Sequence, residues 1–271
     1  MNNLITRTLT GSVLVAAVAG AIFAGSWWLF ALFFLVTLFA VKETLQLTKI
    51  KSGAFKLIVL VSSMALYVML AYPGQGRLQT EWVPPLIAMA SFFILISALW
   101  LVREETINQL GAAFFTVIYA VTPFALAVRI PTGGGLWEAE PWLLMSLFIL
   151  IWANDTFAYL IGIMFGKNKL FERISPKKSW EGWIGGLIMT LAFTFLLEAK
   201  LKLFSTPHWL LLASVTVIFG TFGDLTESLL KRSAGIKDSG NILPGHGGIL
   251  DRFDAMMIAT PVYYFCIILI Y

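Results

Sequence analysis

Long apolar runs follow one another along almost the whole chain. Nine of them are long enough, or nearly so, to cross a bilayer as helices, because about 20 apolar residues span the hydrocarbon core. They cover residues 9–25, 27–41, 56–72, 84–102, 110–129, 141–164, 183–198, 209–230 and 255–271. The pattern predicts an all-α, polytopic integral membrane helical bundle with about nine transmembrane helices.

The first two runs are separated only by Gly25 and Ser26. They form either a tight hairpin or one broken re-entrant unit. The first run does not have the form of a cleavable signal peptide, because Arg7 is its one basic flank and a second apolar run follows at once.

Composition supports a membrane protein and excludes some site types. Apolar and aromatic residues make up 59% of the chain and charged residues 13%, whereas soluble domains usually carry about 25% charged residues. Cys266 is the one cysteine, which excludes an intrachain disulfide and a cysteine-based zinc site.

The basic residues are distributed unevenly over the two sides of the predicted bundle. With nine crossings, 15 of the 19 Lys and Arg residues fall on the side of the N-terminus and of the loops near 42–56, 103–109, 165–182 and 231–254. Cytoplasmic loops carry such an excess. The count predicts a cytoplasmic N-terminus and places both most polar loops, 165–182 and 231–254, in the cytoplasm. The two loops stay in the cytoplasm even if the first hairpin does not cross the membrane, because removing two crossings leaves every later loop on the same side.

The two halves of the chain differ in their ionisable residues. Spans within residues 1–140 contain few of them, which predicts an N-terminal scaffold, whereas residues 141–271 carry acids within or at the ends of spans. We expect one structural unit whose catalytic region is 141–271. Many membrane enzymes dimerise, and the first hairpin is a candidate interface, but the sequence does not decide for or against a homodimer.

Carboxylates in the C-terminal half are the first candidates for chemistry. Asp155 lies beside Asn154 inside the sixth run, Asp224 lies in the eighth, and Asp251 and Asp254 open the ninth. A charge at membrane depth costs at least about 2.5–3.5 kcal/mol, so such residues face a polar cavity or a partner. The plain alternative is an interhelical hydrogen bond or ion pair.

Asp224, Ser228 and Lys231 are spaced i, i+4, i+7 and so share one helical face, with Arg232 adjacent. Hard cations such as Mg²⁺ bind carboxylate and phosphate oxygens together, so this stripe is a candidate site for a metal and a phosphate. Basic residues facing lipid headgroups would explain Lys231 and Arg232, but not Asp224.

The following loop, SAGIKDSGNILPGHGGILDRFD, contains five glycines. Glycines allow backbone N–H groups to approach an anion closely, although a glycine turn alone is more often a simple loop. His246 can donate to phosphate or move a proton, and Lys237 and Arg252 add positive charge. Asp251 and Asp254 are i, i+3 and can face one point at a helix start.

A third cluster, SPKKSWEG, covers residues 175–182. Ser179 or Ser175 is a candidate cap for the seventh helix, and Lys177 and Lys178 lie where anionic headgroups or a nucleotide would be. A positive-inside anchor is the alternative. Together the clusters predict a cytoplasmic, metal-dependent site for a phosphorylated ligand. The chain contains no G-x-x-x-x-G-K-[ST], so a P-loop NTPase is not supported.

The run from Ser228 to Asp254 resembles the signature of the phosphatidate cytidylyltransferase family, with no departure from its pattern. The stretch from Asn154 to Gly182 resembles the bacterial members. The resemblance implies that phosphatidic acid attacks the α-phosphorus of CTP, giving CDP-diacylglycerol and pyrophosphate in phospholipid biosynthesis. It also implies Mg²⁺, with a second cation such as K⁺ or another Mg²⁺.

The resemblance also assigns roles by position. Asp224 and Asp251 are the implied metal ligands, and both are counted as catalytic together with Lys231 and Asp254. The implied substrate contacts are Asn154, Asp155, Lys177, Lys178, Ser228, Arg232, Lys237, His246, Gly247, Gly248 and Arg252.

The site is expected at the cytoplasmic ends of spans six to nine, where cytosolic CTP meets phosphatidic acid in the leaflet. A side opening between helices would admit the acyl chains. The tail-free length favours a bacterial cytoplasmic membrane, and no nucleic-acid partner is expected.

Two other functions remain open on the residues alone. A CTP-dependent lipid kinase of the dolichol or phytol type would release CDP rather than pyrophosphate. An ion-coupled secondary transporter would use Asp155 and Asp224 as coupling-ion sites, although the chain shows no duplicated half. A CDP-alcohol phosphotransferase is less well supported, because its D-G-x-x-A-R pattern is missing.

Overall fold

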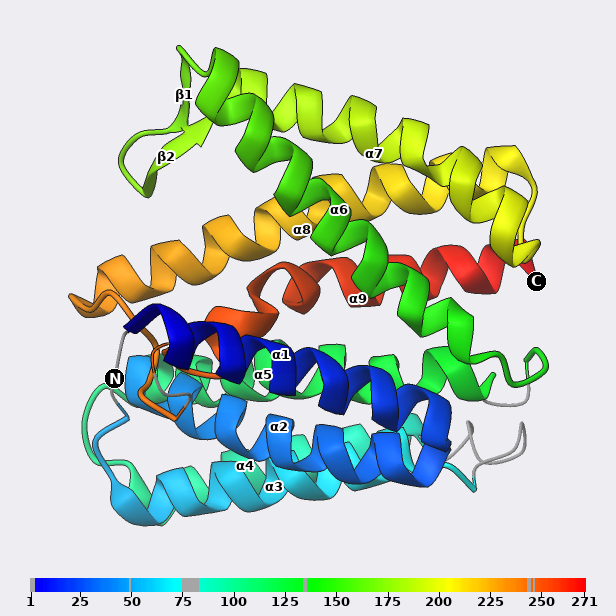
Figure 1. The fold of residues 1–271 in the computed structure, drawn as a ribbon. Coiled ribbons are helices and arrows are strands. Elements are labelled where there is room, and N and C mark those ends of the chain that lie inside the picture. The colour runs from blue at the N-terminus through cyan, green and yellow to red at the C-terminus, as the bar shows by residue number, and fades with distance from the viewer. Residues whose placement is uncertain (1–2, 49, 75–82, 134–135, 243–244, 246) are drawn as a thin grey trace. The chain divides into compact units, whose positions relative to one another are not determined.

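The computed structural model describes residues 3–48, 50–74, 83–133, 136–242, 245 and 247–271. Over these residues the chain forms nine α-helices and one short hairpin of two strands (Figure 1). The helices are α1 (Asn3–Ala24), α2 (Ser26–Leu47), α3 (Gly53–Ala71), α4 (Val83–Leu101), α5 (Thr106–Thr132), α6 (Pro141–Phe165), α7 (Trp180–Leu201), α8 (Thr206–Ala234) and α9 (Leu250–Ile270). The predicted all-α class is confirmed.

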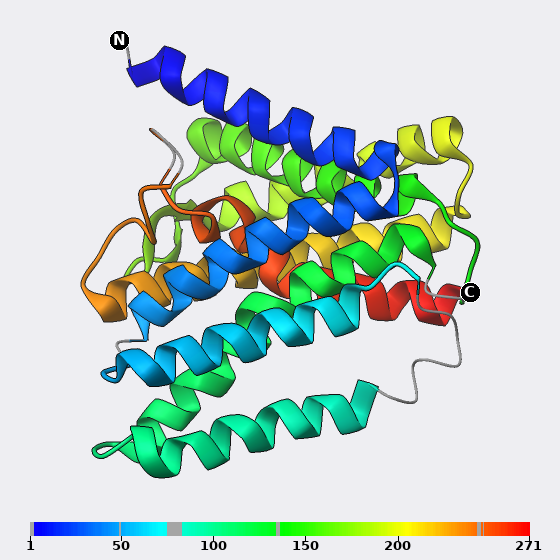
Figure 2. The same ribbon diagram turned by 90° about the horizontal axis from the view of Figure 1, so that it is seen from below.

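Within the described part of the chain, eight helices, α2 to α9, are long and apolar enough to cross a membrane. The first helix contributes a shorter apolar stretch, Thr8–Ala24. Each of the nine predicted runs falls in a helix of its own. The first two form a helical hairpin whose arms pack together and meet at Gly25, which has a positive φ of 115° (Figure 2).

The chain divides into two compact units. Unit 1 contains residues 1–141 and 238–253, and unit 2 contains residues 142–237 and 254–271. In unit 1, α2 packs on α3 and α5, and α3 packs on α4 and α5 (Figure 1). Residues 238–253, called here the glycine-rich segment, belong to this unit, where the Phe253 ring meets the rings of Phe33 and Phe124 at centroid distances of 6.3 and 5.5 Å.

In unit 2, α7 packs along α8, and a β-hairpin connects α6 to α7. Strands β1 (Lys169–Phe171) and β2 (Ser175–Ser179) pair antiparallel. The sequence predicts only a loop near 165–182, because runs of three and five residues are too short to show a strand period. Of the two predicted caps, the structure uses Ser179, whose Oγ accepts a hydrogen bond from the Gly182 N–H at 3.2 Å.

Several helices extend beyond the apolar runs that predicted them. Helix α2 continues to Leu47 and α8 to Ala234, because polar residues continue the backbone hydrogen bonds past the apolar segment. Glu43 therefore lies in a helix rather than in a loop, and Lys231 and Arg232 lie on α8, as their spacing from Asp224 predicts.

Candidate active site

A cavity of about 440 Å³ lies in unit 2, a size typical of small-ligand sites. Apolar side chains form much of its wall, among them Ile151, Ile163, Leu170 and Trp183. Its charged and amide side chains are Asn154, Asp155, Lys177, Lys178, Asp224 and Asp254. The cavity thus combines an apolar wall with a few polar groups. These six polar residues are all site residues predicted from the sequence.

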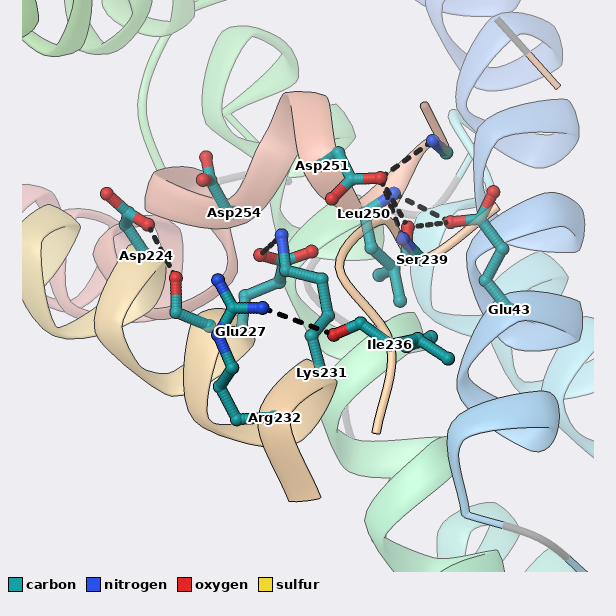
Figure 3. Close-up of polar contacts among 12 residues, drawn as sticks. Glu43, Asp224, Glu227, Lys231, Arg232, Ile236, Ser239, Leu250, Asp251 and Asp254 are labelled. Carbon is teal, nitrogen blue, oxygen red and sulfur yellow. Dashed lines mark hydrogen bonds and ion pairs between the residues drawn. The ribbon is translucent and has the colours of Figure 1, made fainter. Parts of the chain in front are cut away.

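Helix α8 carries a stripe of polar side chains (Figure 3). Ser228 Oγ donates to Asp224 Oδ1 at 3.3 Å, as their shared helical face predicts. Glu227, three residues after Asp224, is fully buried and forms an ion pair with Lys231 at 2.5 Å. The helix ends at Ala234 and is capped by Gly235, with Lys231 and Arg232 in the last turn, where cations stabilise the negative end of the helix dipole.

Gly223 on α8 allows Asp254 of α9 to lie beside this stripe. A Cβ at Gly223 would lie 2.4 Å from the backbone oxygen of Asp254 and 2.9 Å from that of Ala255. The backbones of α8 and α9 therefore approach closely at the turn that carries Asp224. As a result, one carboxylate oxygen each from Asp224, Glu227 and Asp254 lie within 4.8 Å of one another.

These three carboxylates fit a hard divalent cation. Mg²⁺ binds oxygen ligands at about 2.0–2.1 Å, so oxygens around one ion lie at most about 4.2 Å apart, and small side-chain movements bring oxygens that lie within 4.8 Å of one another to such distances. Lys178 forms an ion pair with Asp224, and Lys231 forms one with Glu227. The cluster is thus an acidic centre partly neutralised by two lysines, which is the charge balance that a metal and a phosphate could take over.

The β-hairpin places both predicted lysines at the cavity. Lys178 reaches Asp224, and the exposed Lys177 lines the cavity beside it. On α6, Asn154 and Asp155 are also at the cavity. Asn154 Oδ1 is buried, and within the described residues it has no hydrogen-bond partner. The role of Asn154 as a substrate contact stays a prediction.

The glycine-rich segment and Asp251 are organised differently. Asp251 Oδ2 accepts hydrogen bonds from the Ser239 N–H at 2.9 Å, from Ser239 Oγ at 3.0 Å and from the Gly248 N–H at 2.7 Å. The Gly248 N–H, expected at a phosphate, thus points to a carboxylate of the protein. The metal role of Asp251 and the substrate contacts of Gly247 and Gly248 stay predictions. His246 lies outside the described residues.

The remaining predicted contacts are basic and exposed. Arg232, Lys237 and Arg252 have exposed side chains, and Arg232 Nη1 makes a long contact of 3.5 Å with the Ile236 carbonyl. Their roles as substrate contacts stay predictions.

Sequence reasoning missed Glu227. A signal was present, because this acid follows Asp224 by three residues and precedes Lys231 by four. At those spacings all three side chains fall near one face of a helix. The predicted polar face contained Ser228 and Lys231 but not Glu227.

Comparisons with known proteins identify the family to which the chain is similar. A model described as the cytidylyltransferase family matches residues 5–270. A phosphatidate cytidylyltransferase of Staphylococcus haemolyticus is 36% identical over 269 residues, covering 94% of this chain and 96% of the relative. Proteins of the same name from Staphylococcus epidermidis and Haemophilus influenzae are 34% and 33% identical, and the matches cover 94% and 95% of this chain and 96% of each relative.

The close approach at Gly223 generates a test of the acidic cluster. Gly223→Ala places a methyl group against two backbone oxygens, and overpacking of this kind costs about 1–3 kcal/mol. We expect a lower thermal unfolding midpoint in detergent and loss of the upward shift that Mg²⁺ gives the unchanged protein, because a bound ion stabilises the folded state.

The matched control is Gly220→Ala, one turn earlier, where a Cβ would meet Ala255 at an ordinary 3.6 Å. This variant should keep both the midpoint and the Mg²⁺ shift. An equal Mg²⁺ shift in both variants would contradict the role of the close approach.

Proposed function

We propose that this chain, which belongs to the cytidylyltransferase family, is a phosphatidate cytidylyltransferase that converts CTP and phosphatidic acid into CDP-diacylglycerol and pyrophosphate. The observation that carries the proposal is the cluster of Asp224, Glu227 and Asp254 with its two lysines, beside a cavity among helices that are apolar enough to span a membrane. The names of the relatives support the same reaction.

The reaction is a displacement at phosphorus. An oxygen of the phosphatidate phosphate forms a bond to the α-phosphorus of CTP, the bond from that phosphorus to the bridging oxygen breaks, and pyrophosphate leaves with the electron pair. The attacking phosphate is already anionic and needs little deprotonation. The protein must therefore mainly align the two phosphates and offset their repulsion.

Asp224, Glu227 and Asp254 are the proposed ligands of Mg²⁺, because their donors are all carboxylate oxygens within 4.8 Å of one another. When bound, the ion neutralises charge on the phosphate oxygens and fixes their geometry. The family resemblance adds a second cation, K⁺ or another Mg²⁺, and keeps Asp251 as a candidate ligand.

Lys178 and Lys231 are proposed to pair first with carboxylates of the protein and then with phosphates of the substrates. Lys178 and Lys231 pair with Asp224 and Glu227 in the structure. When these carboxylates bind a cation instead, the ammonium groups turn to the phosphate oxygens of the substrates. Lys177 adds charge beside them, and Asn154 Oδ1 accepts a hydrogen bond from a ligand donor.

The apolar part of the cavity wall is the proposed path for the lipid. Ile151, Ile163 and Leu170 line it beside the polar groups, so a phosphate can reach the lysines while acyl chains stay in an apolar environment. A short, water-soluble phosphatidate analogue that reacts as well as the lipid would argue against this path.

The product identifies the reaction. Purified protein in detergent, given phosphatidic acid, Mg²⁺ and CTP labelled at the α-phosphorus, should move the label into a lipid that co-migrates with CDP-diacylglycerol. Asp224→Asn should lower the rate at least about 100-fold, because it removes a charged ligand at the reacting phosphates. Chelation of divalent cations should stop the reaction.

The control is Glu104→Gln, which makes a similar acid-to-amide change in a side chain that is 75% exposed, and it should leave the rate unchanged. Label remaining in free CDP would contradict the proposal and indicate the lipid-kinase alternative. Absence of turnover with any lipid would indicate the transporter, although neither alternative gains support from the relatives' names.

We further propose that the chain lies in a bacterial cytoplasmic membrane with its N-terminus and site facing the cytoplasm. Bacterial relatives and the uneven distribution of Lys and Arg support this orientation. The β1–β2 hairpin and the end of α7 are at opposite ends of one candidate span, Trp180–Leu201.

Cysteine labelling tests the orientation. The one native cysteine, Cys266, is buried and is replaced by alanine to give a blank background. In spheroplasts, a membrane-impermeant maleimide should label Lys200→Cys at once, but should label Glu172→Cys, in the hairpin, only after permeabilisation. The opposite order would show that the site faces outward.

A further inference from the structure

Glu43 is a buried acid in the half of the chain that was predicted to be a scaffold. It lies on α2 and is only 2% exposed. Its carboxylate is engaged on both oxygens: Oε1 accepts from the Ile249 N–H at 2.9 Å, and Oε2 accepts from the Leu250 N–H at 2.9 Å and from Ser239 Oγ at 2.8 Å (Figure 3).

The two N–H groups belong to the start of α9. The first N–H groups of a helix lack partners within the helix, and the positive end of the helix dipole favours a negative charge there. A residue next to the helix start usually supplies the cap. Here the cap is an acid 206 and 207 residues away in the sequence, so α2 fixes where α9 begins.

Ser239 joins Glu43 to a second carboxylate. Its hydroxyl contacts both Glu43 Oε2 and Asp251 Oδ2, and its N–H donates to Asp251 Oδ2. Ser239 is 3% exposed. The segment from Ser239 to Asp251 is therefore held at both ends by one network that centres on a buried side chain of α2.

Two glycines of the segment fit tightly against the Glu43 carboxylate. A Cβ at Gly248 would lie 2.4 and 2.5 Å from its two oxygens, and a Cβ at Gly240 would lie 2.6 Å from Oε1. A side chain at either position would displace the Glu43 carboxylate. Gly240 and Gly248 therefore allow the backbone to approach this carboxylate closely.

We infer that Glu43 is a positioning residue for the reaction proposed above. It sets the glycine-rich segment and the first turn of α9, the turn that carries Asp251 and Arg252 and from which the helix continues to Asp254. Glu43 itself does not touch the substrates; it acts through the residues it holds. The inference rests on the proposed function for its effect on turnover, but the structural part can be tested without it.

Hydrogen exchange tests the structural part. In Glu43→Gln, one carboxylate oxygen becomes an amide nitrogen that cannot accept from an N–H. Mass spectrometry on the full chain in detergent should show at least about tenfold faster exchange at the amides of residues 248–250, because opening of this turn becomes easier. Glu104→Gln should exchange at these amides like the unchanged protein. Equal exchange in both variants overturns the inference, whatever the activity is.

Kinetics test the functional part. Glu43→Gln should lower kcat at least about tenfold and change the KM for CTP less than threefold, whereas a purely destabilising change would lower the active fraction and leave the turnover of the folded enzyme unchanged. Glu43→Asp, which keeps the charge on a shorter arm, should recover part of kcat. An unchanged kcat in folded Glu43→Gln overturns the positioning role.

Ser239→Ala keeps the inference testable if Glu43→Gln does not fold. It preserves both N–H bonds to Glu43 and removes the hydroxyl contacts to Glu43 Oε2 and Asp251 Oδ2, so it should lower kcat about fivefold. Full activity in Ser239→Ala, or an effect on KM alone, contradicts the inference. If the unchanged protein itself shows no cytidylyl transfer, the proposed function fails, and the exchange experiment alone decides the role of Glu43.

Discussion

A carboxylate inside a membrane-spanning helix has to be compensated, and this constraint shapes both units of the protein. An uncompensated buried charge is strongly destabilising, whereas a charge that is paired and hydrogen-bonded is tolerated. In unit 2, Asp224 and Glu227 are compensated by Lys178 and Lys231. In unit 1, Glu43 is compensated by main-chain N–H groups and a hydroxyl. Each partner comes from a specific element, so each acid also fixes the position of that element.

The two forms of compensation suit two different tasks. Ion pairs with flexible lysines can be exchanged for a cation and a phosphate, which suits the site where substrates bind. Hydrogen bonds from the main chain of a helix start cannot be exchanged without moving the helix, which suits a permanent anchor. The acids of unit 2 are therefore proposed as ligands, and Glu43 as the support for the segment that bears the family signature.

Much of the fold could be predicted, because hydrophobic runs report directly on bilayer-spanning helices. The ends of α2 and α8 and the β1–β2 hairpin could not, since they depend on backbone hydrogen bonds that leave no apolar pattern. In the site, the i, i+4 spacing foretold the contact between Asp224 and Ser228. The role of Glu43 could not be predicted, because its hydrogen-bond partners lie about 200 residues away in the sequence and local residue spacing does not indicate them.

The central claim is that Asp224, Glu227 and Asp254 together hold a divalent cation. Titration of purified protein with Mn²⁺, followed by electron paramagnetic resonance of the free ion, tests it most directly. If these three carboxylates hold the ion, Mn²⁺ binds at this site with an affinity that falls at least about tenfold in Glu227→Gln and is unchanged in Glu104→Gln. Equal Mn²⁺ affinity in the unchanged protein and Glu227→Gln would contradict the account.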